Sequence, residues 1–178
     1  RPAPEKSALL VTILLGFVFF AGIAMTVNEG LWSNLVNTVC ILLAGVAGIF
    51  IGLPVGVLVL EQSGKGAELA WYFLFGGVWL TFFVVIMVLR VLVDRASPVR
   101  VRFIPQLDRF VGPLVGLLAA VLFTSLLACT LLYLPISAGE WKIDDGPGWA
   151  TTWMQRAATP MNSVIKRIEN AEGVDVGS

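Results

Sequence analysis

Few side chains in this sequence could carry out acid–base, nucleophilic or metal chemistry. It contains no histidine and two cysteines, Cys40 and Cys129, which both lie inside apolar runs. Their spacing matches neither a metal site nor a redox pair, and small side chains are common where membrane helices touch, so we interpret both as packing residues. Intramembrane proteolysis would need paired aspartates, serine with histidine, or a metal within the apolar runs. We therefore predict a protein that is not an enzyme and has no cofactor or metal.

The polar residues that stand out lie where apolar runs begin. Asp108 and Arg109 precede a charge-free run that starts at Phe110. The carboxylate could favour the positive N-terminus of a helix there, pair with a nearby arginine, or contact a partner protein. Asn34 and Thr38 are four residues apart and share a helix face. We expect these two to hydrogen-bond to a neighbouring helix, and a substrate site is the alternative.

The elements that position these residues are long charge-free runs. The chain has 178 residues, of which 57% are hydrophobic and 13% are charged, whereas soluble domains carry about 25% charged residues. Residues 7–28, 30–60, 69–89 and 110–139 contain no charge, and each run exceeds the ~20 residues that a helix needs to cross a bilayer. We predict an all-α integral membrane protein with a polar lead at 1–7, a four-span membrane domain at 8–134 with transmembrane helices at about 8–27, 35–60, 69–91 and 110–134, and a short extramembrane C-terminal tail at 135–178.

Two of the predicted spans carry small residues at every fourth position. A spacing of four places them on one helix face, which lets another backbone approach closely. The two faces could meet each other or a second copy of the chain. Pro54 should kink the second span, because it removes a backbone hydrogen bond, and a hinge or the wall of a narrow pathway is the alternative to packing. The predicted packing residues are Ala44, Gly48, Gly52 and Gly56 in the second span and Gly112, Gly116 and Ala120 in the fourth.

The connections predict the topology. The turn at 28–30 is short enough to return the second span antiparallel beside the first, and the basic connection at 90–109 is expected on the cytoplasmic side. In the tail, apolar residues at helical spacing predict two short amphipathic helices on the membrane surface, with Thr159 as the cap of the second and Pro160 as its first residue. A small packing domain outside the membrane is the alternative.

One motif in the chain resembles a known family. Leu107-Asp108-Arg109-Phe110-Val111-Gly112, followed by Val115-Gly116-Leu117, is similar to the L-D-R-hydrophobic-hydrophobic-G…G-L signature of the colicin V production protein (CvpA) family. The resemblance extends over about residues 7–133. It implies a multi-pass protein of the bacterial inner membrane that serves as a non-enzymatic accessory or scaffold in colicin V (toxin) production or export and in envelope maintenance. It also implies that Leu107, Asp108, Arg109 and Gly112 are candidate partner contacts.

Two functions follow from these features. A scaffold would bind the lipid bilayer and either itself or other membrane proteins through the small-residue helix faces. The alternative is a pore-forming or transporter subunit that works in an oligomer, although no ionisable residue falls in the middle of a predicted span. We expect no nucleic-acid partner.

Overall fold

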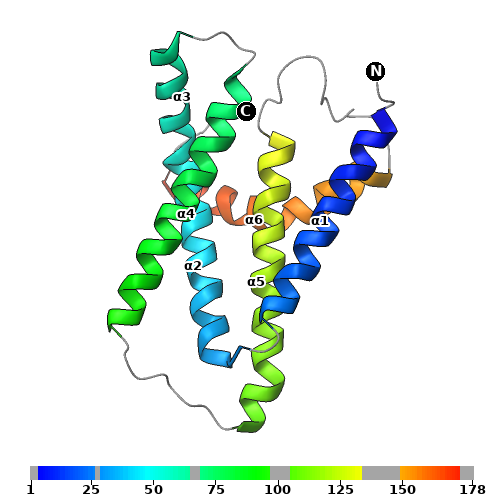
Figure 1. The fold of residues 1–178 in the computed structure, drawn as a ribbon, viewed down its shortest axis with the longest axis vertical. Coiled ribbons are helices and arrows are strands. Elements are labelled where there is room, and N and C mark those ends of the chain that lie inside the picture. The colour runs from blue at the N-terminus through cyan, green and yellow to red at the C-terminus, as the bar shows by residue number, and fades with distance from the viewer. Residues whose placement is uncertain (1–3, 27–28, 65–68, 97–104, 134–148, 173–178) are drawn as a thin grey trace.

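The structure is a computed structural model, and it describes residues 4–26, 29–64, 69–96, 105–133 and 149–172. In this part of the chain every regular element is a helix (Figure 1). The helices are α1 (Pro4–Thr26), α2 (Leu31–Phe50), α3 (Gly52–Ser63), α4 (Ala70–Ala96), α5 (Pro105–Tyr133) and α6 (Trp149–Glu172).

Three of the helical runs are long and apolar enough to cross a membrane. They are Leu31–Ser63, which joins α2 and α3, Ala70–Ala96, and Asp108–Leu132. α1 contains a shorter apolar stretch, Val11–Thr26. The prediction of an all-α protein with helices able to span a membrane is therefore confirmed for these three runs. Each of these runs contains a long stretch without charge. A helix makes all of its backbone hydrogen bonds internally, so such a stretch can cross hydrocarbon without leaving backbone groups unsatisfied.

The helical run Leu31–Ser63 is interrupted at Ile51, between α2 and α3. Ile51 has φ −104° and ψ −43°, and its backbone N–H still donates to the carbonyl of Ala47 at 2.9 Å. Pro54 is the third residue of α3. Because proline has no backbone N–H, the carbonyl of Phe50 loses its usual donor four residues on. The interruption at Ile51 thus lies within one turn before Pro54 and next to Phe50, whose carbonyl lacks its usual donor.

α2 and α5 form the centre of the bundle (Figure 1). α4 packs along one side of α2 and α3, whereas α1 packs along α5 and touches α6. The expected pairing of the first two spans along their length is therefore wrong. The reason is local: Gly22 of α1 lies so close to α5 that a Cβ there would be 3.1 Å from the Cβ of Ala120. Small side chains on α5 allow α1 to pack closely against α5 instead of against α2.

In the described part of the tail, residues 149–172 form one helix, α6, instead of the two short helices that were predicted. Pro160 lies inside it, and the Thr159 hydroxyl donates to the carbonyl of Gln155 within the same helix, so Thr159 caps nothing. Buried residues on both sides of the proline, Ala158 and Met161, hold the helix against the bundle. Tertiary packing thus overrides the helix-breaking tendency of the proline.

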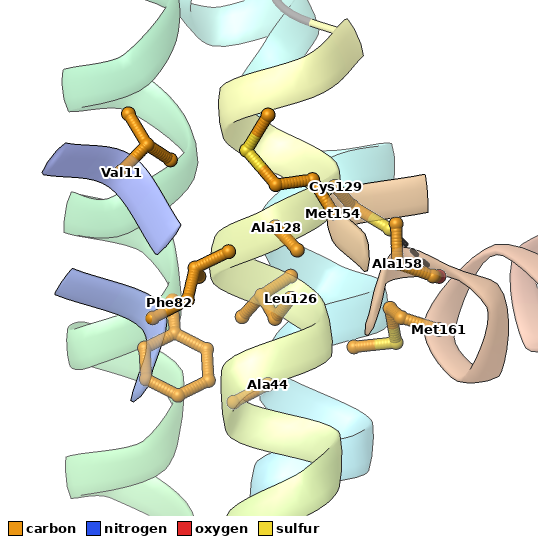
Figure 2. Close-up of a cluster of buried hydrophobic side chains, with 10 residues drawn as sticks. Val11, Ala44, Phe82, Leu126, Ala128, Cys129, Met154, Ala158 and Met161 are labelled. Carbon is orange, nitrogen blue, oxygen red and sulfur yellow. Dashed lines mark hydrogen bonds between the residues drawn. The ribbon is translucent and has the colours of Figure 1, made fainter. Parts of the chain in front are cut away.

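Buried side chains from five helices form the core (Figure 2). Met154 and Met161 of α6 are 1% and 0% exposed, so this helix completes the core and does not merely rest on a surface. The principal members are Val11, Ala44, Phe82, Leu126, Ala128, Cys129, Met154, Ala158 and Met161.

We predict that Met161→Ala destabilises the protein by about 2 kcal/mol or more, because it leaves a cavity among α2, α5 and α6. Thermal or denaturant unfolding in detergent micelles measures this. Lys166→Ala, on the exposed face of α6, is the matched control and should have little effect. Equal effects of the two substitutions would mean that α6 is not part of the core.

Candidate functional site

The small-residue face of the second span is closed by α4. A Cβ at Gly52 would lie 2.6 Å from the carbonyl oxygen of Gly77, and a Cβ at Gly56 would lie 2.7 Å from that of Phe73. Gly48 is similar, with a backbone oxygen of α4 at 3.0 Å from its would-be Cβ. These glycines therefore allow two backbones to touch. The sequence analysis did not single out Gly77, although the Gly76-Gly77 pair in the apolar run of α4 was the available signal.

The other two small residues of this region face the core. Ala44 is fully buried in the cluster of Figure 2. Gly45, on the adjacent position, lies against the terminal methyl of Met161 and beside Leu126, so a Cβ there would require the Met161 side chain to shift. The second span thus uses one face for α4 and a neighbouring face for α5 and α6.

The small-residue face of α5 meets the end of α1 and the start of α2. A Cβ at Gly116 would lie 2.7 Å from both the Cβ and the hydroxyl oxygen of Thr26, and Gly112 lies against the backbone at the start of α2. Ala120 contacts Gly22 of α1, as described above. The faces of the second and fourth spans therefore do not meet each other within the chain: each is occupied by a different neighbour.

Asp108 caps a helix other than its own. It lies in the first turn of α5, and its carboxylate accepts a hydrogen bond from the backbone N–H of Leu31, the first residue of α2. The N-cap of α2 is Gly30, which has no side chain to do this, and a Cβ at Gly30 would be 3.3 Å from the Asp108 carboxylate. The carboxylate thus satisfies a free N–H of α2 and also favours the positive end of that helix. Of the other motif residues, Arg109 is exposed and the side chain of Leu107 lies outside the described residues.

Asn34 is the centre of a buried polar network at the same end of the bundle. Its side chain is fully buried, and its Nδ2 donates to the carbonyls of Thr26 (3.0 Å), Glu29 (3.3 Å) and Gly112 (2.9 Å). Its Oδ1 is buried without a hydrogen-bond partner. One amide thereby joins the end of α1, the turn and α5.

Thr38 extends this network by one turn. Its hydroxyl is placed to donate to the carbonyls of Asn34 at 2.7 Å and of Val115 at 3.3 Å. The expectation that Asn34 and Thr38 make interhelical hydrogen bonds is therefore confirmed. Such bonds contribute about 0.6–2 kcal/mol each within a membrane, so they fix the contact between α2 and α5.

A groove begins beside this network. It has a volume of about 610 Å³ and is bordered by α1, α2, α4 and α5. At its polar end, Asn37 Nδ2 donates to Glu29 Oε2 at 2.8 Å, and Arg90 Nη1 donates to Asn37 Oδ1 at 2.9 Å. The remaining lining is mostly apolar and includes Phe17, Ala21, Met25, Ile41, Ala120 and Phe123.

A smaller cavity of about 320 Å³ lies among α1, α5 and α6. Thr124 lines it, and its buried hydroxyl has no hydrogen-bond partner. Leu15, Phe19, Val121 and Trp153 make its walls largely apolar.

The cysteines take part in packing. Both are buried and free, and the Cys129 thiol donates to the carbonyl of Ala158 at 3.2 Å, which joins α5 to α6. Within the described residues, no three His, Cys, Asp or Glu side chains are grouped so as to hold a metal ion. The polar groups around Asn34 and Asp108 are arranged to hold helices together.

Comparison with known proteins adds no assignment: no family model, no curated protein and no solved structure matches the chain. The similarity to the CvpA family therefore stays a prediction from the sequence.

The glycine contact between α3 and α4 can be tested with a matched pair of substitutions. We expect Gly52→Leu to lower the thermal stability in detergent strongly and to reduce the amount of folded protein in the membrane, because the side chain would collide with backbone atoms of α4. Gly76→Leu adds the same side chain at the position before Gly77. A Cβ at Gly76 would meet nothing within 4 Å, so this substitution should be tolerated. Equal tolerance of both would contradict the close contact.

The cap provides a second test. Asp108→Ala leaves the Leu31 N–H unsatisfied, and we expect a loss of about 0.5–2 kcal/mol in unfolding free energy. Arg109→Ala, one residue away on the exposed surface, should change it little. If the Asp108 variant unfolds normally yet loses partner binding, the carboxylate serves a partner instead of α2.

Proposed function

We propose that the protein crosses the bacterial inner membrane four times, with α1 as the first span. α1 has 23 residues, and at 1.5 Å per residue it would extend about 34 Å, enough for a hydrocarbon core of about 30 Å. Its outward side chains Ile13, Phe17 and Phe20 are large, apolar and exposed. The alternating directions of α1, α2–α3, α4 and α5 in Figure 1 support this topology. The connection 90–109 would then lie in the cytoplasm, with both termini on the other side.

The observation that carries the functional proposal is the position of α6. It crosses behind the bundle at about half its height (Figure 1). Met161 lies against Gly45, in the middle third of the 33-residue apolar run, and its N–H donates to the hydroxyl of Ser125 at 2.9 Å. The apolar face of α6 therefore contacts the membrane-spanning helices at a depth where lipid surrounds them. Its exposed face carries Gln155, Arg156, Thr159, Ser163, Lys166, Arg167 and Asn170.

A charged face at that depth cannot face lipid tails. Each charge exposed to hydrocarbon costs at least about 2.5–3.5 kcal/mol, and α6 exposes Arg156, Lys166 and Arg167 together. Water or another protein surface has to cover them. We infer that several copies of the chain, or a polar partner, enclose the α6 faces and exclude lipid from them.

The function we propose is therefore a non-enzymatic, self-associating scaffold or accessory protein, with the role in colicin V production or export and envelope maintenance that its CvpA-like motif implies. The use of Asn34, Thr38 and Asp108 in structural hydrogen bonds supports a scaffold over an enzyme. Because the small-residue faces are occupied by the chain's own helices, partner contacts would use the exposed face of α6.

The charged face of α6 also supports a second candidate function, that of a pore-forming subunit. If the α6 faces of several copies surround water, they line it with more positive than negative side chains: Arg156, Lys166 and Arg167 against Glu169. Such a pathway would favour anions.

Cysteine cross-linking tests the association. We expect Lys166→Cys to form covalent dimers with a short bis-maleimide in native membranes, because α6 faces of neighbouring copies lie together. Leu80→Cys, on the 67% exposed outer side of α4, is the control and should remain monomeric. Absence of dimers from Lys166→Cys, together with a monomeric mass in mild detergent, would contradict the proposal.

Two further measurements separate the candidates. A pore should release chloride from proteoliposomes, and Lys166→Glu should reduce this flux, whereas a scaffold should give no flux. For the biological role, deletion of the gene should lower the colicin V secreted by a producing strain, and complementation with Lys166→Glu should fail if the α6 face is needed.

A further inference from the structure

The groove between α1 and α4 exists because α1 packs along α5 and leaves α2. α1 and α4 lie on opposite sides of α2 and α5 in Figure 1, and α4 contributes Arg90 to the lining of the groove. Its volume of about 610 Å³ falls in the usual range of ligand sites, about 300–1,000 Å³. Phe17 and Met25, at its α1 border, are 71% and 78% exposed. In a bilayer this side of the molecule faces lipid, so the groove is open to molecules that are already dissolved in the membrane.

The lining changes character along the groove. Phe17, Val18, Ala21, Ile41 and Phe123 offer an apolar wall. The polar groups collect at the other end, where α1 ends and α2 begins. This end lies near the membrane boundary, because Glu29 precedes α2 and Arg90 is within the last two turns of α4. A ligand with an apolar chain and a polar head at the boundary matches this order.

The charges at the polar end are separated in a specific way. Asn37 accepts a hydrogen bond from Arg90 and donates one to Glu29, so its amide lies between the guanidinium and the carboxylate. Arg90 is exposed and Glu29 is half-buried, and both line the groove. The site therefore presents one cation and one anion side by side, each with hydrogen-bonding capacity left for a ligand.

The geometry points to a phospholipid with a zwitterionic, primary-amine head group as the occupant of this groove. The lipid phosphate would bind the Arg90 guanidinium, which suits phosphate oxygens. The ammonium group, two carbons away from the phosphate, would bind the Glu29 carboxylate, and one acyl chain would lie along Phe17 and Phe123. An anionic glycerol head group has no cation to bind Glu29, so it would leave this carboxylate without a partner from the lipid. This inference does not depend on self-association through α6.

Lipid competition on the full-length protein tests it. The delipidated protein in detergent would be mixed with equal amounts of phosphatidylethanolamine and phosphatidylglycerol of the same chain length, and bound lipid would be counted by native mass spectrometry. We expect the wild type to prefer phosphatidylethanolamine by roughly tenfold or more, the effect of one hydrogen bond to a charged group. Glu29→Gln should abolish this preference, and Arg90→Gln should weaken the binding of both lipids.

Matched controls keep the result specific. Glu61→Gln and Arg95→Gln remove one charge each from exposed positions outside the groove and should leave binding and preference unchanged. Ala21→Trp fills the groove and should displace lipid, while Ala24→Trp, on the exposed side of α1, should not. Thermal melts would verify that each variant is folded. Equal binding of the two lipids by the wild type, or unchanged binding in both Arg90→Gln and Ala21→Trp, would overturn the proposal.

Discussion

The arrangement of this protein depends on a polar joint between the start of α2 and the start of α5. Asn34 donates to the carbonyl of Gly112, and Asp108 accepts from the N–H of Leu31, so each helix satisfies groups of the other. A helix pair joined only by apolar contacts could slide, because lipid tails are as favourable to leucine as another helix is. A polar group left unpaired in hydrocarbon costs several kcal/mol. This joint therefore sets the register of the two central helices.

The other helices take their places around that register. The same amide binds the carbonyl of Thr26 and brings the end of α1 to α5, where Gly116 and Ala120 make room for it. α4 takes the opposite side through the glycine contact with α3. These two placements leave the groove between α1 and α4, with Asn37 and its charged neighbours at the end nearest the joint. α6 then closes the remaining side, and its exposed face carries Arg156, Lys166 and Arg167.

Sequence reasoning went furthest where one property decides the outcome. Long charge-free runs predicted helices that cross a membrane, and the spacing of Gly48, Gly52 and Gly56 predicted a close helix contact. Neither pattern indicates which other helix the face will contact. The glycine face met Gly77 of α4 and not the matching face of α5, and α1 packed along α5 although a short turn ties it to α2. Periodicity identifies which face of a helix is able to pack, whereas the choice of partner depends on how well all the faces fit together.

What the sequence determined by itself is the class of the molecule: apolar helices of bilayer length, small-residue faces, and an interruption near Pro54. Each follows from backbone hydrogen bonding and from side-chain size, which are properties of a single segment. Only the tertiary structure decided that Asp108 caps α2, that α6 is one helix through Pro160, and that Met161 of α6 packs against Gly45 in the apolar run Leu31–Ser63. These depend on segments as far apart as Leu31 and Asp108 meeting in space, because a free N–H or a buried methionine can be satisfied by any neighbour that the whole fold brings to it.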